Sequence, residues 1–566
     1  MLDKRIVICN QEYKNSINIG KLYFKGDFFE SSGHCFFFKC FLYSSENTIE
    51  QYFEEYLEDK VRFVKELKGE FLLIDYNVEE DSLFFATDRL GKENAFIFNS
   101  DKLLCITNDF WEGISIIKPT EDDINWQAIK EMVIHNLAFK YDTIIKGYTI
   151  TPPASYAVMS LKDYEIKYSL YWKFKFHENV ELTLDEAADK VYEIFDNMFY
   201  TIKNKFPEDT VYGTGLSGGW DSRLIAAFAK KHDMKLQPYC VGQKYSIYPF
   251  KTNGYKVVKK MQKYFDINNL VFIPYDSEDY IIRITDDVLL SPCKNSEYSI
   301  SCRSKIPEFD VMINGEHGGV FFGEFDFENL LKYNKDSIVE YLLSYLSWNQ
   351  GREMILDDGE EELLVEKIQD YINKLDTVDR HEIFYNFFFQ IMSFRTKSGC
   401  FETIYNTKER YSPYLDPDFM DFFLTWDSKL FCNRVLQRKF FTKYFPQLSK
   451  MEDESCDAPL FWRNMNIKSV PYRLYYAAKN YIFKSSLRRK EWLLKDKDFK
   501  WLVEETSQRN REILKSKFPN LDIKEFYRIN PRSTATLVKC LIEVDVALHS
   551  ADGDRESYIK KNYSKK

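Results

Sequence analysis

The chain has 566 residues, of which 45% are hydrophobic and 29% charged, and its formal net charge is −10. This length predicts two or three domains rather than one. The acidic balance argues against a general nucleic-acid-binding protein, which usually carries a basic excess. No long apolar run is present, and the first residues do not resemble a signal peptide, so we expect neither a membrane span nor secretion.

The eleven cysteines are scattered singly, and none forms a C-x-x-C pair. Dispersed cysteines without a secretion signal indicate reduced thiols, and hence a cytoplasmic protein. The same spacing argues against a structural zinc site, because the cysteine ligands of such sites usually come in close pairs.

The first 170 or so residues read as short β-strands separated by turns, the pattern of an antiparallel meander. The sequence GEFLLIDY at 69–76 is one such strand. Helical patterns interrupt the strands at 49–67 and 125–139. We place the end of this first domain at residue 175, giving a domain of residues 1–175.

From about residue 180 the pattern changes to alternating helices and strands. A long amphipathic helix is predicted over 182–206, followed by short apolar strands near 211–216, 236–242 and 270–275 with helices between them. This alternation predicts a parallel α/β sheet. After residue 328 the pattern is mostly helical, and we assign residues 176–566 to one second domain.

The central chemical signal is the string from Gly215 to Arg223, which leaves a predicted strand and opens a predicted helix at Ser222. Gly218 and Gly219 allow backbone N–H groups to turn inward and approach an anion closely. A helix N-terminus adds unpaired donors and a favourable dipole. The hydroxyls of Ser217 and Ser222 can donate as well. The alternative is a tight strand-to-helix turn with a polar cap.

Asp221 cannot favourably face a phosphate alone, so we expect it to hold Mg²⁺, which bridges phosphate oxygens. The G-x-x-x-x-G-K-[ST] pattern of the Walker loop is absent. Instead, S-G-G-x-D-S resembles the pyrophosphate loop of the N-type ATP pyrophosphatases.

Further sequence sharpens this resemblance to the asparagine synthetase family. The segment from residue 67 to 109, with Thr87-Asp88-Arg89-Leu90-Gly91, is similar to the family's glutamine-amidotransferase domain. Pro152-Pro153 matches a late Pro-Gly step imperfectly. Glu409-Arg410-Tyr411-Ser412-Pro413-Tyr414-Leu415-Asp416 resembles the family's E-x-R-x-P-F-L-D.

The resemblance implies a two-domain fold. The first domain would be an αββα sandwich of the Ntn-hydrolase type in degenerate form, and the second an α/β parallel-sheet ATP-pyrophosphatase domain with helical elaborations. It implies ATP and Mg²⁺ as cofactors, with Gly315 among the nucleotide-binding residues. We expect adenine near Leu216 and Val241, at the ends of adjacent strands.

The chain departs from the family at its start. Glutamine-using members carry Cys at position 2, whose thiolate attacks glutamine, whereas this chain has Leu2. Cys9 is the nearest thiol, but it lies in an apolar run. We therefore expect no glutaminase activity, as in the β-lactam synthetases and lasso-peptide cyclases, where the substrate supplies its own amine.

A second departure lies at Asn314-Gly315-Glu316-His317-Gly318-Gly319, where the family has G-E-G-x-D. Glu316 matches the family's Glu, which handles a proton as the amine attacks. Gly319, or Val320 with a one-residue shift, stands at the position of a metal-binding Asp. Glu324 and Asp326 could compensate for that loss.

His317 is more readily a hydrogen-bonded structural residue than a ligand, because no second His or Cys lies at ligand spacing. For a cation that stabilises developing negative charge we select Lys450, with Lys443 and Lys439 as competitors. A solvated side chain is the alternative for all three lysines.

The resemblance, together with these features, implies an ATP-dependent ligase that adenylates a carboxylate and transfers it to an amine, releasing AMP and pyrophosphate. Its partners would be a carboxylate substrate, an amine donor and, in a homodimer, a second copy of the chain. Candidate products are a peptide macrolactam, a β-lactam or a sugar-acid amide. The alternatives are an asparagine synthetase that uses free ammonia, and a catalytically silent member that binds a nucleotide or a partner.

Overall fold

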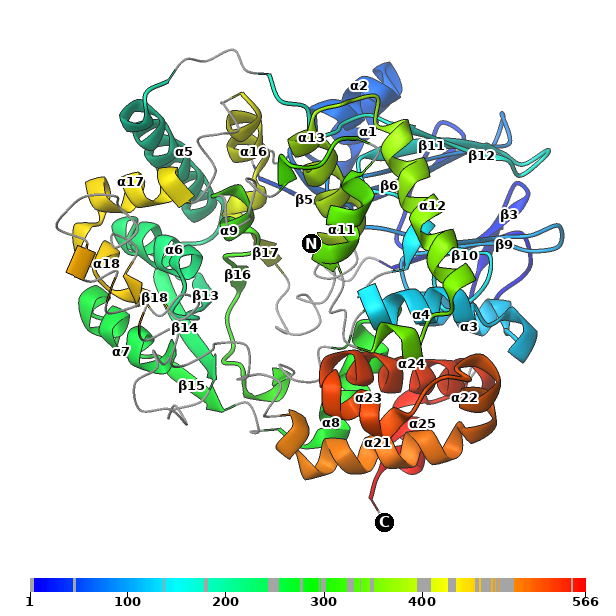
Figure 1. Cartoon of the computed structure of the whole chain (residues 1–566). Helices are drawn as coiled ribbons and strands as arrows, with labels where there is room; N and C mark the ends of the chain where they lie inside the picture. Colours follow the sequence, from blue (N-terminus) through cyan, green and yellow to red (C-terminus); the bar gives the residue numbers. More distant parts are fainter. Residues whose placement is uncertain are drawn as a thin grey trace.

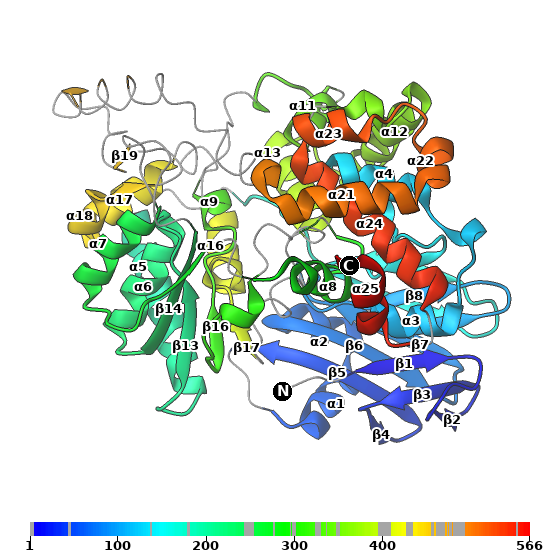
Figure 2. The same cartoon turned by 90° about the horizontal axis from the view of Figure 1, so that it is seen from below.

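The computed structural model contains two antiparallel sheets that share a core and a separate parallel sheet, with helices packed around them (Figures 1 and 2). The structure describes residues 5–565 except 44–46, 136–137, 178–181, 243–253, 275–277, 295, 297–301, 323–329, 336, 347–350, 394–408, 426–433, 454–457, 460–469, 472–473, 475–477, 479–492 and 551–552.

Both antiparallel sheets are built from the first 170 residues. The strands of the first sheet, in spatial order, are β10 (Tyr148–Ile150), β8 (Phe96–Asn99), β9 (Leu104–Thr107), β1 (Ile6–Cys9), β3 (Leu22–Gly26) and β2 (Ile17–Ile19). The strands of the second are β12 (Ile166–Leu170), β11 (Ser155–Ser160), β7 (Ser82–Thr87), β6 (Gly69–Asn77), β5 (His34–Leu42) and β4 (Phe29–Ser31).

The alternation of side chains along β6 shows why this region forms layers. Leu72 and Ile74 point into the core between the two sheets, where they meet Ile6 and Ile8 of β1. Their neighbour Leu73 points the other way, into a second core. Successive side chains of a strand face opposite sides, so one apolar strand fills two cores.

Helices cover the outer face of each sheet. Helices α1 (Ile49–Glu58) and α2 (Lys60–Glu66) close the second sheet, and α3 (Phe110–Ile117) and α4 (Trp126–His135) close the first. The result is the helix–sheet–sheet–helix layering expected from the sequence. The single helix predicted over 49–67 is two helices, because Asp59 leaves helical geometry and caps the backbone N–H groups of Val61 and Arg62. The helix predicted over 125–139 ends at His135.

Helix α8 (Tyr280–Leu290) and the C-terminal helices share the core of α3 and α4 rather than that of the parallel sheet (Figure 2). The C-terminal helices are α21 (Lys497–Arg509), α22 (Arg511–Lys517), α23 (Ile523–Ile529), α24 (Pro531–His549) and α25 (Arg555–Tyr563). Chain order therefore does not coincide with packing, and the domain boundary at 175 stays a prediction.

The parallel sheet has the spatial order β15 (Val271–Pro274), β14 (Lys235–Gly242), β13 (Val211–Gly215), β16 (Val311–Ile313) and β17 (Glu409–Tyr411). Every neighbouring pair is parallel, as the sequence predicts. The chain begins in the middle with β13, adds strands on one side, and then crosses to the other side with β16.

Helices surround this sheet and the space between it and the sandwich. They are α5 (Leu184–Lys205), α6 (Trp220–Lys231), α7 (Gly254–Phe265), α9 (Gly318–Phe321), α11 (Ile338–Leu346), α12 (Asp358–Lys374), α13 (Arg380–Asn386), α16 (Pro417–Leu424), α17 (Val435–Tyr444) and α18 (Pro446–Ser449). Two short strands, β18 (Glu452–Asp453) and β19 (Ala458–Pro459), pair with each other. Among the described helices, none combines the length and apolarity needed to cross a bilayer.

Candidate active site

The candidate site lies where the strand order of the parallel sheet reverses. The neighbouring strands β13 and β16 run in the same direction, so the loops that follow them leave the sheet at the same edge. In open parallel sheets, ligands bind in the crevice at such a reversal, outside the carboxyl ends of the strands. The two loops found here are the Gly-rich segment 216–219 and the segment 314–317.

The Gly-rich loop has the geometry of an anion cradle. Gly218 has a φ of 80°, in the left-handed region, and a Cβ at this position would lie 3.3 Å from the Cα of Gly254. Helix α6 begins at Trp220, two residues before the predicted start, and its N-cap is Gly219 without a side-chain capping bond. Asp221 and Ser222 thus lie in the first turn, where backbone N–H groups face the loop.

The two serines of the motif lie against each other across this loop. The oxygens of the Ser217 and Ser222 hydroxyls are 3.4 Å apart, and the backbone N–H of Gly219 donates to Ser217 Oγ over 3.2 Å. Leu216 is buried at the end of β13, and its N–H donates to the carbonyl of Tyr239 on β14. Val241 lies two residues further along β14, so these two residues end neighbouring strands as expected. The position of adenine remains a prediction.

Asp221 joins the two loops. Its Oδ2 accepts the backbone N–H of Gly319 over 3.0 Å, and its Oδ1 accepts from Gln437 Nε2 over 3.3 Å. A Cβ on Gly318 would lie only 2.5 Å from Asp221 Cγ. The second loop therefore approaches the carboxylate so closely that glycine is required there. Gly319 stands where the family's metal-binding Asp was expected, and it contributes a backbone donor.

Glu316 is buried at the tip of the second loop, with its carboxylate 3.7 Å from Nε2 of His317. Its backbone N–H donates to Asn314 Oδ1 over 3.1 Å. His317 adopts a left-handed φ of 63°, and its ring packs edge-on against Phe388 and Phe389. This packing agrees with a structural role for His317.

The three candidate lysines differ in their surroundings. Lys439 and Lys443 form ion pairs with Asp185 of α5, and Lys443 also contacts Asp189. These pairs turn both side chains toward α5. Lys450 is exposed at the end of α18, and among the three it remains our candidate for the closing cation. Glu324 and Asp326 lie outside the described residues.

Arg223 is a residue of the site that the sequence reasoning passed over. Its guanidinium is fully buried, stacks on the Trp220 ring, and donates to the carbonyl of Gly218 over 2.8 Å. It also donates to the carbonyls of Leu448 and Met451, on either side of Lys450. A buried guanidinium needs several hydrogen-bond acceptors. The signal in the sequence was an arginine directly after the S-G-G-x-D-S string. Arg223 thus ties the Gly-rich loop to the segment that carries Lys450.

Comparison with known proteins places this site in a family. Residues 200–397 match a family model described as asparagine synthase. This match covers 198 of the 566 residues, so the likeness to that family is shown for this region of the chain. The matched region includes α6, both loops and β16. No curated protein sequence matches the chain.

Two solved structures align loosely with this chain. One is titled as the allosteric regulatory enzyme of purine biosynthesis, with 9% identity, a TM-score of 0.18, and coverage of 55% of this chain and 68% of that one. The other is glutamine phosphoribosylpyrophosphate amidotransferase from B. subtilis, with 8% identity, a TM-score of 0.17, and coverage of 56% and 71%. Scores this low carry no conclusion about this chain.

The motif at 409–416 lies beyond the region matched to asparagine synthase, and its residues bond both to the sandwich and to the candidate site. Arg410, on β17, donates to Glu70 of the sandwich over 2.8 Å. Tyr411 donates to Asp416, whose pKa burial raises to about 6. The hydroxyl of Tyr414 donates to the backbone carbonyl of Asp221 over 3.1 Å.

The sandwich contributes a turn to the same region of the molecule. Asp88 accepts backbone N–H bonds from Phe71, Leu90, Lys92 and Glu93 and so shapes the turn after β7. Leu2 lies outside the described residues. Cys9 is buried in β1, and burial raises the pKa of its thiol.

A magnesium ion fits this donor set only together with a nucleotide. Mg²⁺ is often held by one or two carboxylates plus phosphate oxygens and waters. Asp221 offers one carboxylate whose oxygens already accept hydrogen bonds from neutral donors. Among the described residues there is no cluster of three or more metal-ligating side chains. The residues present therefore fit an ion that arrives with phosphates.

Proposed function

We propose that this chain is an ATP-dependent carbon–nitrogen ligase that activates a carboxylate as an acyl-adenylate and passes the acyl group to an amine. One observation carries the proposal: the Gly-rich loop and the loop of Glu316 meet at Asp221, with 3.0 Å between Gly319 N and Asp221 Oδ2. A loop with the geometry of a phosphate cradle and the buried carboxylate of Glu316 thus lie at the same edge of the sheet.

The reaction has two steps. In the first, a substrate carboxylate oxygen attacks the α-phosphate of ATP, and the bond to the leaving pyrophosphate breaks. In the second, the amine attacks the acyl carbon, a C–N bond forms, and the C–O bond to AMP breaks. The amine loses a proton, which Glu316 accepts.

Residues of the chain hold and orient the reactants. The N–H groups at the start of α6 and the hydroxyls of Ser217 and Ser222 bind the pyrophosphate. Asp221 would hold Mg²⁺, which supplies positive charge between phosphate oxygens. Lys450 would add positive charge at the phosphates, and Arg223 holds the backbone on either side of it at Leu448 and Met451.

We further propose that the amine comes from the substrate rather than from glutamine. The sandwich cysteines Cys9, Cys35, Cys40 and Cys105 are all buried. Burial raises the pKa of Cys9, and raises that of Cys35 to about 12. A nucleophilic cysteine needs a lowered pKa and access to its substrate. Added glutamine should therefore release no glutamate, and stoichiometric glutamate would contradict this part of the proposal.

ATP–pyrophosphate exchange tests the first step. The chain is assayed with a panel of carboxylates: aspartate, uronic acids, and peptides that contain Asp or Glu. We expect exchange with at least one of them. Asp221→Asn should abolish the exchange, because the carboxylate that faces the phosphates is lost. Asp185→Asn, at an exposed ion pair on α5, is the matched control and should keep the wild-type rate.

The outcome also separates the alternatives. Exchange with aspartate alone, followed by ammonia-dependent amide formation, would indicate an asparagine synthetase that uses free ammonia. Nucleotide binding without exchange would indicate a silent, nucleotide-binding member.

A further inference from the structure

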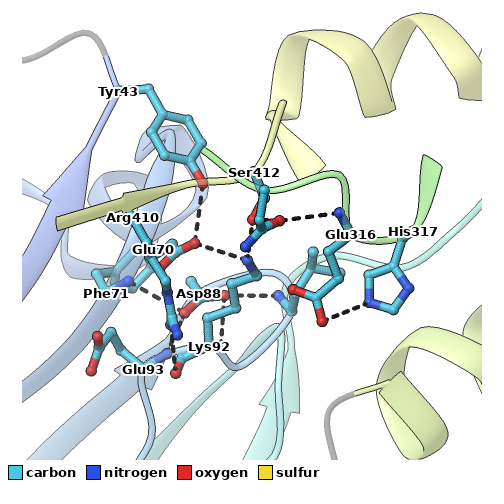
Figure 3. A network of polar contacts seen from close by, with 12 residues as sticks. Tyr43, Glu70, Phe71, Asp88, Lys92, Glu93, Glu316, His317, Arg410 and Ser412 are labelled. Carbon is cyan, nitrogen blue, oxygen red and sulfur yellow. Dashed lines mark hydrogen bonds and ion pairs between the residues drawn. The ribbon is translucent and has the colours of Figure 1, made fainter. Parts of the chain in front are cut away.

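A chain of buried hydrogen bonds links the sandwich to Glu316 (Figure 3). Lys92, in the turn after β7, donates from Nζ to Ser412 Oγ over 3.0 Å. The Ser412 hydroxyl lies 2.9 Å from Asn314 Oδ1, and the same Oδ1 accepts the backbone N–H of Glu316. All four residues are at most 9% exposed.

The protonation of Lys92 and the single hydroxyl proton of Ser412 determine how the Asn314 amide is turned. An ammonium group only donates, so Ser412 Oγ must be the acceptor of its bond with Lys92. The Ser412 proton is then directed to Asn314, and the Glu316 N–H also needs an acceptor there. The atom that receives both bonds must be the amide oxygen, so the amide nitrogen of Asn314 points away from Ser412.

That nitrogen is a buried donor without a hydrogen-bond partner among the described residues. Asn314 is 5% exposed and directly follows β16, at the edge of the sheet where the Gly-rich loop also begins. Buried donors are almost always paired, and an unpaired one calls for an explanation. A donor that is held in orientation but lacks a partner is typical of a group that awaits a ligand.

We infer that Asn314 is a substrate-binding residue whose amide N–H groups bind an oxygen of the acyl group during its activation and transfer. Lys92 and Ser412 are positioning residues that keep the donor side of the amide turned toward the site. This inference rests on the proposed ligase function and adds a residue to it. The sandwich, through Lys92, is then a working part of the ligase site.

The acyl oxygen is the group that gains charge when the amine attacks the acyl carbon. An N–H donor aimed at this oxygen stabilises that charge, and losing one such donor typically lowers kcat by about 10²–10³-fold. Glu316 and Asn314 would then act on two different atoms in the same step. Glu316 takes the proton from nitrogen, and Asn314 binds the oxygen.

The test is Asn314→Asp, which keeps an oxygen for Ser412 and Glu316 but replaces the donor nitrogen with an acceptor. In exchange and amide-formation assays with the active carboxylate, we expect the rate of amide formation to fall by about 10²-fold or more. The KM for ATP should stay within about twofold, because the Gly-rich loop is untouched.

Asn386, a buried residue whose amide is fully bonded to Phe174 and Glu382, offers the matched control. Asn386→Asp should change thermal stability without this selective loss.

Lys92→Met tests the positioning role. Without the ammonium, Ser412 no longer has to accept a bond from residue 92, and the Asn314 amide is free to turn. We expect a roughly tenfold loss of amide formation, with ATP binding kept. Lys39→Met, which breaks a separate Lys–Glu pair with Glu93 on the same sheet, should leave the rate unchanged.

Folded Asn314→Asp protein with wild-type rates in both partial reactions would overturn the inference and leave the ligase proposal standing. Absence of exchange in the wild-type chain with every carboxylate would instead overturn the ligase proposal, and this inference with it.

Discussion

Two buried ion networks in this chain have opposite charge balance. In the interdomain network, Glu70 accepts from Arg410 over 2.8 Å and pairs with Lys92 at 3.0 Å, so one carboxylate serves two cations (Figure 3). In the helical network, Lys539 of α24 lies 3.9 Å from Asp287 and 3.6 Å from Glu543, so one cation serves two carboxylates.

The ratio of cations to carboxylates in each network sets the direction in which the pKa of its carboxylate is shifted. Burial by itself raises the pKa of Glu70, but Arg410 and Lys92 outweigh burial, and the net pKa is lowered. Burial raises the pKa of Glu543 to about 8, with Asp287 adding to the rise, and Lys539 offsets only part of it. Glu543 is therefore largely protonated at neutral pH, whereas Glu70 is ionised.

The difference teaches how each network handles its surplus charge. A surplus carboxylate can take up a proton and become neutral, but a guanidinium cannot lose one. In the interdomain network the cations also donate to neutral acceptors. Lys92 donates to Ser412 Oγ, and Arg410 donates to the Lys92 carbonyl. The Ser412 hydroxyl in turn extends the network to Asn314 at the candidate site.

The largest expected effect comes from removing the shared carboxylate. Glu70→Gln removes the carboxylate that Lys92 and Arg410 share, while both cations stay buried. Breaking a buried pair in this way typically costs about 3–5 kcal/mol. Urea unfolding should show a loss in that range, and a loss comparable to that of a surface variant would contradict this account of the interdomain network.

Removing the shared cation should cost less. Lys539→Met leaves Asp287 and Glu543 together, but protonation of Glu543 relieves their repulsion. We expect a loss of about 2 kcal/mol at neutral pH. The loss should grow as the pH rises above 8, since protonation then becomes harder. An equal loss of unfolding free energy at low and high pH would show that protonation of Glu543 does not relieve its repulsion with Asp287.

The two networks should also respond to pH in opposite directions. The stability that Glu543 contributes is complete below its ordinary pKa of 4.5 and is lost as the pH rises through about 8. The contribution of Glu70 is present above 4.5 and is lost as the pH falls through its lowered pKa. Glu543→Gln should therefore flatten the stability curve between pH 5 and about 8 while leaving the acid limb unchanged. Calorimetric unfolding across this range measures both limbs.

The smallest effect is expected at the partly exposed pair beside the interdomain network. Lys39 and Glu93 lie 2.8 Å apart with 23% and 11% of their side chains exposed. Lys39→Met should cost about 1 kcal/mol or less, because pairs near water gain little. A loss as large as that of Glu70→Gln would erase the distinction between the two kinds of pair.

Much of the layering could be predicted from local pattern. The alternating apolar residues of 69–76 form β6, and the alternation after residue 180 forms a parallel sheet. The S-G-G-x-D-S string follows a strand and opens a helix, as predicted, although α6 starts at Trp220. These features depend on residues near one another in the chain, where side-chain period and glycine geometry are decisive.

By itself the sequence determined the Gly-rich loop, the carboxylates Asp221 and Glu316 and the alternation that makes the sheet, because each is a property of a short segment. Only the tertiary structure decided that Gly319 closes on Asp221, that Arg223 anchors the segment around Lys450, and that Lys92 reaches Ser412 and Asn314. These contacts join segments up to hundreds of residues apart. Their partners are chosen by which strand ends and turns the folded chain brings to one edge of the sheet.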